Sequence, residues 1–301
     1  MDILLPPRLR AGDRVRLVSP ASFPSEEDLA ESVQVLESWG LVVEIGEHAL
    51  DRHGYMAGRD DDRLADLNDA YRDPGVRALF AARGGAGAYR IADALDFAAV
   101  RSDPKPLVGF SDITNLHLAL WRHCRIAGVH GSLSGDRSAA STRALLMEPG
   151  PTVLHRDEDA LTAAVRVPGT ARGNVVGGHL GTLAWSVGAG LPSLDGAILF
   201  VEAPRAVGLG HVDRQLTQLA RSGSIQGLRG VALGRFPGFE DYTDRGWTVL
   251  DVLRDQLERW GVPVVGGIDV GHGDDPLSVP LGPVAELDAD AGTLTVQPAV
   301  R

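Results

Sequence analysis

One serine of this chain follows a hydrophobic run and precedes a segment with helical spacing. The run is residues 106–108, and Gly109 and Phe110 separate it from Ser111. At the N-terminus of a helix, exposed N–H groups can stabilise negative charge on a nearby oxygen. Gly109 lacks a Cβ and lets a sharp turn form before the serine. The position suits a nucleophile, although a serine before a helix is most often only an N-cap.

Two more residues, far apart in the sequence, could complete the chemistry of such a serine. Glu202 directly follows the apolar residues 197–201, and His272 lies between two glycines in a short loop. Alone, each has a commoner explanation, as a solvated acid or an incidental loop histidine. Acyl transfer by serine needs a base for the hydroxyl proton and an acid that holds the imidazole in the correct tautomer. Ser111, His272 and Glu202 are the minimal complete set.

Other candidate residues have weaker claims. His130, before Gly131, is the best competitor of His272, and we interpret it as lining the pocket. Arg83 and Arg205 could each hold a substrate carboxylate in a bidentate fork, although both could be simple surface arginines. Paired cysteines and the H-E-x-x-H motif are absent from the sequence, so we expect no metal site.

A glycine-rich segment, residues 83–87, follows a predicted strand but fails the G-x-G-x-x-G spacing of dinucleotide sites. We therefore expect no cofactor. Adjacent glycines can instead point backbone N–H groups at an oxyanion, or can form a plain turn at the end of a strand.

The composition restricts the class of ligand. The chain has 301 residues, 44% hydrophobic and 23% charged, with a net charge of -11. This is an ordinary globular composition, and its acidity argues against nucleic acid. No apolar run is long enough to span a membrane, the N-terminus does not resemble a secretory signal, and the one cysteine cannot form an internal disulfide. We expect a cytoplasmic enzyme acting on a small or peptidic substrate.

The elements that must position these residues follow an alternating pattern. The sequence predicts strands at residues 15–18, 41–45, 76–82 and 107–110, with helices between them, one of which begins at a capping box formed by Ser25 and Asp28. This pattern indicates an α/β fold with a parallel sheet, in which ligands bind at the carboxyl ends of the strands. The Gly84-Gly85 pair and Ser111 both fall at such ends.

The chain length favours two domains. We place the first at residues 1–150, a linker at 151–174 and a smaller, mixed β/α domain at 175–301. The second domain is predicted to hold strands at 197–201 and 230–233, helices at 213–219 and 247–260, and a hairpin at 284–296.

The motifs together resemble those of the serine LD-carboxypeptidases, the family of murein tetrapeptide carboxypeptidases and microcin C self-immunity peptidases. The matching segments, in chain order, are Arg10-Ala11-Gly12-Asp13-Arg14-Val15, Ser19-Pro20-Ala21, Gly54-Tyr55-Met56-Ala57-Gly58, Arg63 with Ala65-Asp66-Leu67-Asn68, Arg83-Gly84-Gly85, Val108-Gly109-Phe110-Ser111-Asp112-Ile113-Thr114, His130-Gly131, Gly177-Gly178-His179-Leu180, Asp213-Arg214-Gln215-Leu216, Gly271-His272 and Pro280-Leu281-Gly282.

The resemblance implies a flavodoxin-like, doubly wound first domain that carries Ser111 as nucleophile. It implies a second domain that carries Glu202 and His272 as relay partners, and an oxyanion hole made by the backbone N–H groups of Gly85 and Asp112. It also implies a homodimer.

Three positions depart from the family pattern, namely Ala86, the run Ala203-Pro204-Arg205, and His179 in place of an asparagine. All are expected to line the substrate pocket. The resemblance implies a serine carboxypeptidase that releases the terminal D-alanine from murein-derived tetrapeptides by cleaving an L,D-amide bond. One alternative is an immunity-type peptidase that cleaves aminoacyl or peptidyl nucleotide analogues. Another is a non-catalytic module that binds a nucleotide or a sugar.

Overall fold

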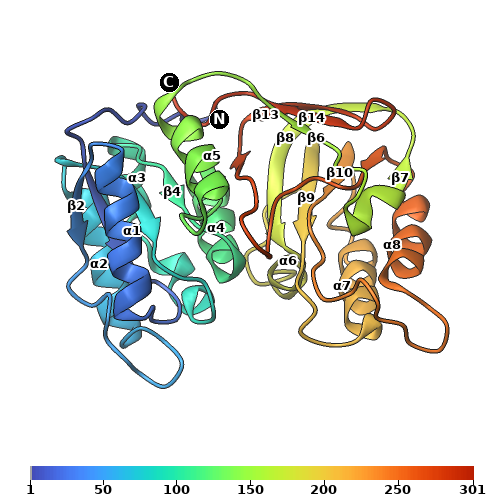
Figure 1. Cartoon of the computed structure of the whole chain (residues 1–301), viewed down its shortest axis with the longest axis horizontal. Coiled ribbons are helices and arrows are strands. Elements are labelled where there is room, and N and C mark those ends of the chain that lie inside the picture. Colours follow the sequence, from blue (N-terminus) through green and yellow to red (C-terminus); the bar gives the residue numbers. More distant parts are fainter. Residues whose placement is uncertain (1) are drawn as a thin grey trace.

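The computed structural model describes residues 2–301, which form two sheets lying side by side (Figure 1). The first sheet has the order β12-β5-β4-β3-β1-β2. Its strands are β1 (Arg14–Val18), β2 (Val42–Ile45), β3 (Val76–Ala81), β4 (Leu107–Val108), β5 (Gly128–His130) and β12 (Val279–Leu281). All neighbours in it are parallel except β12, which pairs antiparallel with β5. The predicted parallel sheet is confirmed.

Helices cover both faces of the first sheet because its strands alternate apolar side chains between the faces. One core contains residues of α1 (Glu26–Ser38) and α5 (Asp136–Met147), and the other contains residues of α2 (Asp60–Arg72), α3 (Phe97–Ser102) and α4 (Thr114–Cys124). The predicted capping box of α1 is confirmed: Ser25 Oγ accepts from Asp28 N at 3.0 Å, and the Asp28 carboxylate accepts from Ser25 N at 3.3 Å.

The second sheet has eight strands in the order β6-β14-β13-β8-β9-β10-β11-β7. Its strands are β6 (Thr152–His155), β7 (Arg166–Val167), β8 (Thr170–His179), β9 (Ala197–Glu202), β10 (Gly230–Leu233), β11 (Val264–Val265), β13 (Val284–Asp288) and β14 (Thr293–Val296). Strands β8 to β11 are mutually parallel and the remaining pairings are antiparallel, so the sheet is mixed.

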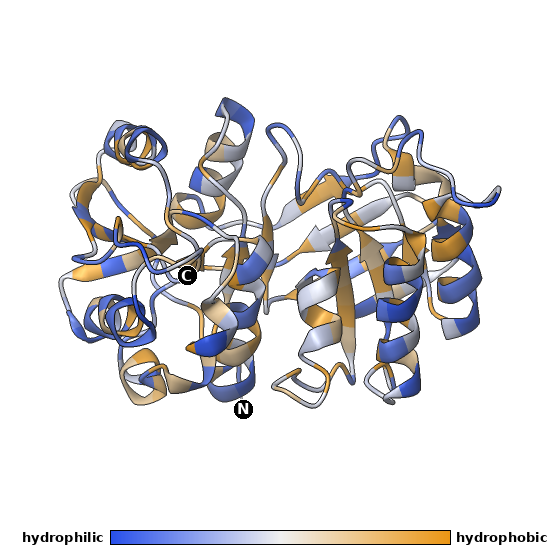
Figure 2. Cartoon of the chain, turned by 90° about the horizontal axis from the view of Figure 1, so that it is seen from below, coloured by the Kyte–Doolittle hydropathy of each residue, from blue (hydrophilic) through white to orange (hydrophobic). Residues whose placement is uncertain are grey.

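Three amphipathic helices bury their apolar sides in one core with the parallel strands of the second sheet: α6 (Leu180–Trp185), α7 (Leu209–Arg221) and α8 (Val249–Leu257). Figure 2 shows hydrophobic residues along the strands and hydrophilic residues on the outer sides of the helices. Short 3-10 helices lie at Ala88–Arg90, Ala92–Ala94, Ser111–Ile113, Leu161–Ala164 and Glu258–Trp260. Within residues 2–301, no helix combines the length and apolar character needed to cross a bilayer.

The segment that we expected to be a linker, residues 151–174, contains β6, β7 and the first half of β8. Strands β6 and β7 form the two edges of the second sheet, and β7 has only two residues. Strands this short leave too little periodic pattern for the sequence to reveal them.

The end of the chain returns to the first sheet. Strand β12 passes between the two sheets and pairs with β5 (Figure 1). Ala299 and Val300 are buried in the core of α1 and α5, and Arg301 N donates to the carbonyl of Pro6 at 2.9 Å. The two sheets are therefore tied together by chain segments that cross from one to the other.

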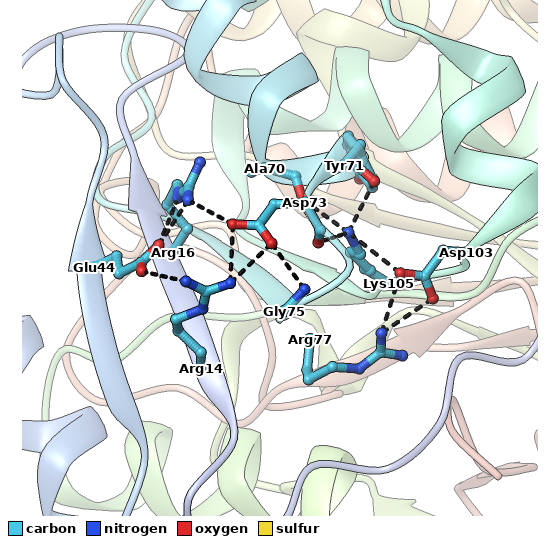
Figure 3. A network of polar contacts seen from close by, with 10 residues as sticks. All are labelled: Arg14, Arg16, Glu44, Ala70, Tyr71, Asp73, Gly75, Arg77, Asp103 and Lys105. Atoms are coloured by element: carbon cyan, nitrogen blue, oxygen red, sulfur yellow. Dashed lines mark hydrogen bonds and ion pairs between the residues drawn. The ribbon is translucent and has the colours of Figure 1, made fainter.

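A polar network lies at the amino ends of β1, β3 and β4 (Figure 3), whereas Ser111 follows the carboxyl end of β4. Lys105 is fully buried, and its ammonium donates to the carbonyls of Ala70, Tyr71 and Asp73 at 2.6–2.9 Å. These carbonyls belong to the last turn of α2 and the residue after it, which have no partners inside the helix. Arg14 bonds the Asp73 carboxylate at 2.8 Å and so joins β1 to the same corner.

Candidate active site

Ser111 occupies a strained turn at the end of β4. The strand is only two residues long, shorter than the predicted 107–110, and Ser111 has a φ of +63°. A left-handed conformation costs a residue other than glycine about 1–2 kcal/mol, and such strain gathers at functional sites. The Ser111 side chain caps no helix, and its hydroxyl makes no hydrogen bond within the described residues. The N-cap interpretation is wrong, and the half-buried hydroxyl has no hydrogen-bond partner within residues 2–301.

Two glycines shape this turn by leaving space. Gly109 does not adopt a positive φ, and it serves the turn by lacking a Cβ. A Cβ on it would lie 2.9 Å from both the Ala81 Cβ and the Ile113 Cγ2. A Cβ on Gly84 would lie 2.8 Å from the Ser111 Cβ. Ser111 makes the sharp turn, and the glycines allow neighbouring segments to press against it.

The segment after β3 is fixed beside Ser111. Gly85 has a φ of +103°, and its N–H has no hydrogen-bond acceptor within residues 2–301. Ser22 holds the segment on one side by donating its N–H to the carbonyl of Gly84 at 3.1 Å. Asp112 holds it on the other side, where its carboxylate accepts from Ala88 N at 2.8 Å. Burial raises the pKa of Asp112, although the bond from Ala88 opposes the shift.

Glu202 and His272 are in direct contact. Glu202 ends β9 and is completely buried, and His272 follows a loop glycine. Oε2 of Glu202 lies 2.6 Å from Nδ1 of His272 and accepts from the backbone N–H of the same residue at 3.1 Å. Burial alone would raise the pKa of Glu202, but the hydrogen bond and charge of His272 outweigh it and leave the pKa below its usual range. The carboxylate is ionised and orients the imidazole.

Glycines also make room for this pair. A Cβ on Gly271 would lie 2.7 Å from the Cβ and Cγ of Glu202, and one on Gly234 would lie 3.0 Å from the Glu202 Cβ. Gly271 has a φ of +120°, which favours glycine there in any case. The backbone can therefore approach the buried carboxylate closely enough for His272 to bond it twice.

The loop of His272 is anchored on the first sheet's side of the molecule. Asp275 accepts from the backbone N–H groups of Arg137 and Ser138 at 3.0 and 2.6 Å, at the N-terminus of α5. The bond from Ser138 is the main reason that the pKa of Asp275 is lowered. Asp269, just before the loop, forms ion pairs with Arg137 and Arg235. These contacts set the position of His272 relative to the elements that carry Ser111.

The residue before Ser111 meets the imidazole of His272. The Phe110 and His272 rings pack edge to face with centroids 5.0 Å apart. No hydrogen bond joins the Ser111 hydroxyl to His272 in the described residues. The structure brings Glu202 and His272 together and places His272 against Phe110, the residue before Ser111. Catalytic hydrogen bonds are often long or misaligned without substrate.

His179 lies between the two sheets. It pairs in register with Glu202 on the adjacent parallel strand, and its backbone N–H donates to Thr114 Oγ1 of α4 at 3.1 Å. Its ring caps α6 and lies 5.8 Å from the ring of His272. Burial lowers the pKa of His179. A contact of His179 with substrate stays a prediction.

We expected His130 to line a pocket, but it is buried in the interior instead. Its side chain is 1% exposed because β5 is an inner strand, and it packs between the rings of Phe110 and Phe200 at 5.8 and 5.1 Å. Burial lowers the pKa of His130 to about 3. Direct contact with a substrate is closed to it.

A small cavity begins on one side of the Ser111 turn. It has a volume of about 260 Å³ and is bordered by Gly84, Phe110 and the exposed Arg83. Hydroxyl and carboxylate groups also line it, from Asp28, Glu31, Ser32, Ser132 and Ser134.

A larger cavity begins at Ala86 and Asn115 and has a volume of about 570 Å³. Residues of α4 and of the segment after α6 line this cavity, and Trp185 forms one of its walls. Trp185 and Tyr89, which also lines it, are 68% and 52% exposed. Both cavities border residues that flank the Ser111 turn, and neither is lined by Ser111, Glu202 or His272.

Arg205 borders neither cavity. Its Nε donates to the carbonyl of Gly238 at 2.5 Å, and its guanidinium lies over the Tyr242 ring at 4.6 Å. The expectation that Arg205 grips a substrate is therefore not supported, because these contacts already hold the guanidinium to a loop of the second half.

A group of possible metal ligands lies apart from this site. His48, Asp51 and Asp62 present ligand atoms within 4.8 Å of one another. His48 Nδ1 already bonds the Asp51 carboxylate at 2.8 Å, which is the main reason that the pKa of His48 is raised. This bond explains the cluster without an ion.

Sequence reasoning missed the residues that act through spacing and anchoring. Gly271 directly precedes His272 in the sequence, but its role depends on its close approach to Glu202, which is 69 positions away. No feature of the sequence connected Asp275 with Arg137, which lies 138 positions away. Trp185 ends α6 and is 68% exposed, and no feature of the sequence marked it as exposed.

Comparison with known proteins agrees with this architecture. Two family models match the chain: "LD-carboxypeptidase N-terminal domain" over residues 15–131 and "LD-carboxypeptidase C-terminal domain" over residues 172–287. A putative carboxypeptidase of Streptomyces coelicolor is 40% identical over 98% of this chain and 96% of its own. A probable murein peptide carboxypeptidase of Bacillus subtilis is 33% identical, with 98% and 95% covered. The solved structure of MccF in complex with glutamyl sulfamoyl guanosine has a TM-score of 0.86 at 22% identity, with 98% of each chain covered.

Proposed function

Because this chain belongs to the LD-carboxypeptidase family, we propose that it is a serine carboxypeptidase that releases the terminal D-alanine from murein-derived tetrapeptides. The bond cleaved is the amide between the L-centre of the dibasic residue and D-alanine. We propose a cytoplasmic homodimer as its working form.

In this mechanism the Ser111 hydroxyl attacks the carbonyl carbon and His272 accepts the hydroxyl proton. The tetrahedral oxyanion would be stabilised by the N–H groups of Gly85 and Asp112. His272 then returns the proton to the leaving amine as the C–N bond breaks. Water hydrolyses the resulting ester by the same route, releasing the shortened peptide as a carboxylate and restoring Ser111.

The hydrogen bond between buried Glu202 and His272 is the observation that carries this proposal. A fully buried, ionised glutamate is costly unless it is paired, and here its partner is an imidazole that remains 23% exposed next to the Ser111 turn. An acid that orients an accessible histidine is the arrangement that acyl transfer by serine requires.

The cavities support a direction for the substrate. Arg83, at the small cavity, suits the free carboxylate of the leaving D-alanine. The larger cavity suits the longer acyl side of the peptide.

The test is release of D-alanine from a purified murein tetrapeptide, with the diastereomer that ends in L-alanine as a matched control. We expect release only from the D-isomer. Equal cleavage of both, or of neither, would refute the proposed specificity.

A second candidate is cleavage of an aminoacyl nucleotide analogue, and the exposed rings of Trp185 and Tyr89 favour it. Exposed aromatic rings stack on nucleobases at about 1–3 kcal/mol per base. A side-by-side assay on the tetrapeptide and on aminoacyl-sulfamoyl adenosine separates the two. Exchange of Trp185 for Ala should impair only the reaction on the adenosine compound if this candidate is correct.

A further inference from the structure

Three buried polar atoms near the Glu202–His272 pair have no hydrogen-bond partner among residues 2–301. They are Nδ1 and Nε2 of His130 and Oε1 of Glu202. His130 is 1% exposed and Glu202 is fully buried. An unpaired buried polar group costs about 1–3 kcal/mol, and in native proteins such groups are commonly satisfied by ordered water.

The two residues are linked through the ring of Phe200. His130 ends β5 of the first sheet, and Glu202 ends β9 of the second. Phe200 precedes Glu202 by two positions on β9, so it projects from the same side of the strand, and its ring lies 5.1 Å from that of His130. Phe110 contacts the ring of His130 and that of His272. The same two phenylalanines thus place His130 beside the catalytic pair.

The chemistry of the unpaired atoms is complementary. His130 is neutral near pH 7 because burial lowers its pKa, so one ring nitrogen carries an N–H donor. The titratable groups around it are Glu202 of β9, His272 of its loop, His179 at the end of β8 and His117 of α4. Glu202 is the one acid among them. Its Oε2 accepts twice from His272, whereas its Oε1 accepts from no residue of the described chain.

We infer that His130 is a positioning residue that donates its ring N–H, through one ordered water, to Oε1 of Glu202. A water is required because no direct hydrogen bond joins the two side chains. Held at both oxygens, the carboxylate cannot rotate and keeps Oε2 aimed at His272. The inference rests on the proposed function, in which that orientation activates Ser111.

The test measures the rate at which a serine-directed phosphonate labels the full-length protein, read by intact mass. This readout needs an activated serine but no knowledge of the natural substrate. The variants are His130→Leu, which removes the donor, and His130→Asn and His130→Gln, whose amide nitrogens imitate Nδ1 and Nε2 respectively. Thermal unfolding of each variant is measured in parallel.

We expect His130→Leu to slow labelling on the order of tenfold to hundredfold, the usual effect of losing a group that orients an active-site ligand. Its melting temperature should change little, because Leu keeps the apolar packing against Phe110 and Phe200 and only one water-mediated bond is lost. Either the Asn or the Gln variant should recover most of the rate and so identify the nitrogen that donates. A structural role would lower stability together with the rate.

Two results would overturn the inference alone while the wild type is labelled. One is equal labelling of the wild type and the Leu variant, and the other is an equal loss in all three variants. Failure to label the wild type would overturn the proposed serine chemistry and this inference with it.

Discussion

Because Gly271 has no side chain, the loop of His272 can approach Glu202 closely. We expect Gly271→Ala to lower kcat about a hundredfold, because its Cβ would push the carboxylate away from His272 and small misplacements of reacting groups cost about that much. Steady-state kinetics on the tetrapeptide, with KM determined separately, measures this.

Gly273 offers a matched control in the same loop. It has a φ of +118°, close to that of Gly271, but a Cβ on it would meet only the flexible end of Arg235 at 3.0 Å. Gly273→Ala carries the same backbone strain and should lower kcat far less. Equal losses in both variants would show that strain, and not contact with Glu202, explains the effect.

His117 should make the fold sensitive to acid. Burial lowers its pKa to about 4, from about 6.5 when exposed, and its Nε2 bonds the carbonyl of Gly109 at 2.9 Å. The folded state therefore binds this proton less tightly than the unfolded state. Its contribution to stability is fully present above pH 6.5 and is lost as the pH falls towards 4, at up to about 1.4 kcal/mol per pH unit.

Urea unfolding at pH 6.5 and 4.5 tests this contribution. The free energy of unfolding should fall less between the two values in His117→Gln than in the wild type. Parallel losses in the two proteins would assign the acid sensitivity to other groups.

The residue types in the sequence were enough to choose the candidate site residues, but the structural surroundings of these residues could not be predicted from it. Ser111, Glu202 and His272 could be chosen because each stands at the end of a predicted strand or in a glycine loop. The positive φ of Ser111 and the burial of His130 depend on segments distant in sequence, and a local pattern cannot report such contacts.

At the scale of elements, the ammonium of Lys105 should hold the end of α2 in place. Lys105→Met would leave the carbonyls of Ala70, Tyr71 and Asp73 without this donor in a buried corner. We expect the free energy of unfolding to fall by about 3 kcal/mol, the size seen when one partner of a buried charged contact is lost. Chemical denaturation measures it.

Activity per folded molecule should be unchanged in Lys105→Met, since Lys105 lies before the amino end of β4 and Ser111 follows its carboxyl end. Arg72→Met, at the same helix end, is the control: Arg72 is 56% exposed in its ion pair with Asp96 and should contribute at most about 1 kcal/mol. A smaller effect for Lys105 than for Arg72 would contradict this role.

Elements with strong local signals were predictable. The capping box at Ser25 and the hairpin at residues 284–296 appear as expected, because each depends on residues close in sequence. Strands β6 and β7 and the crossing of β12 to the first sheet depend on partners more than 90 positions away, so periodicity did not reveal them.

At the scale of the whole molecule, Asp275 should fix the position of the loop of His272 relative to α5. In Asp275→Ala the N–H groups of Arg137 and Ser138 lose their acceptor, and the loop can move away from Ser111. We expect kcat to fall on the order of tenfold, with a small change in stability. The side chain of the adjacent Asp274 makes no hydrogen bond in the described chain, so Asp274→Ala is the matched control. Similar kcat values for the two variants would remove Asp275 from the account.

Ser111 as nucleophile is the claim on which the account rests, and the most direct measurement compares D-alanine release by the wild type and by Ser111→Ala at equal concentrations of folded protein. The account predicts that the variant keeps the wild-type melting temperature and loses at least about a thousandfold in kcat. Hydrolysis by Ser111→Ala at a rate near that of the wild type would contradict it.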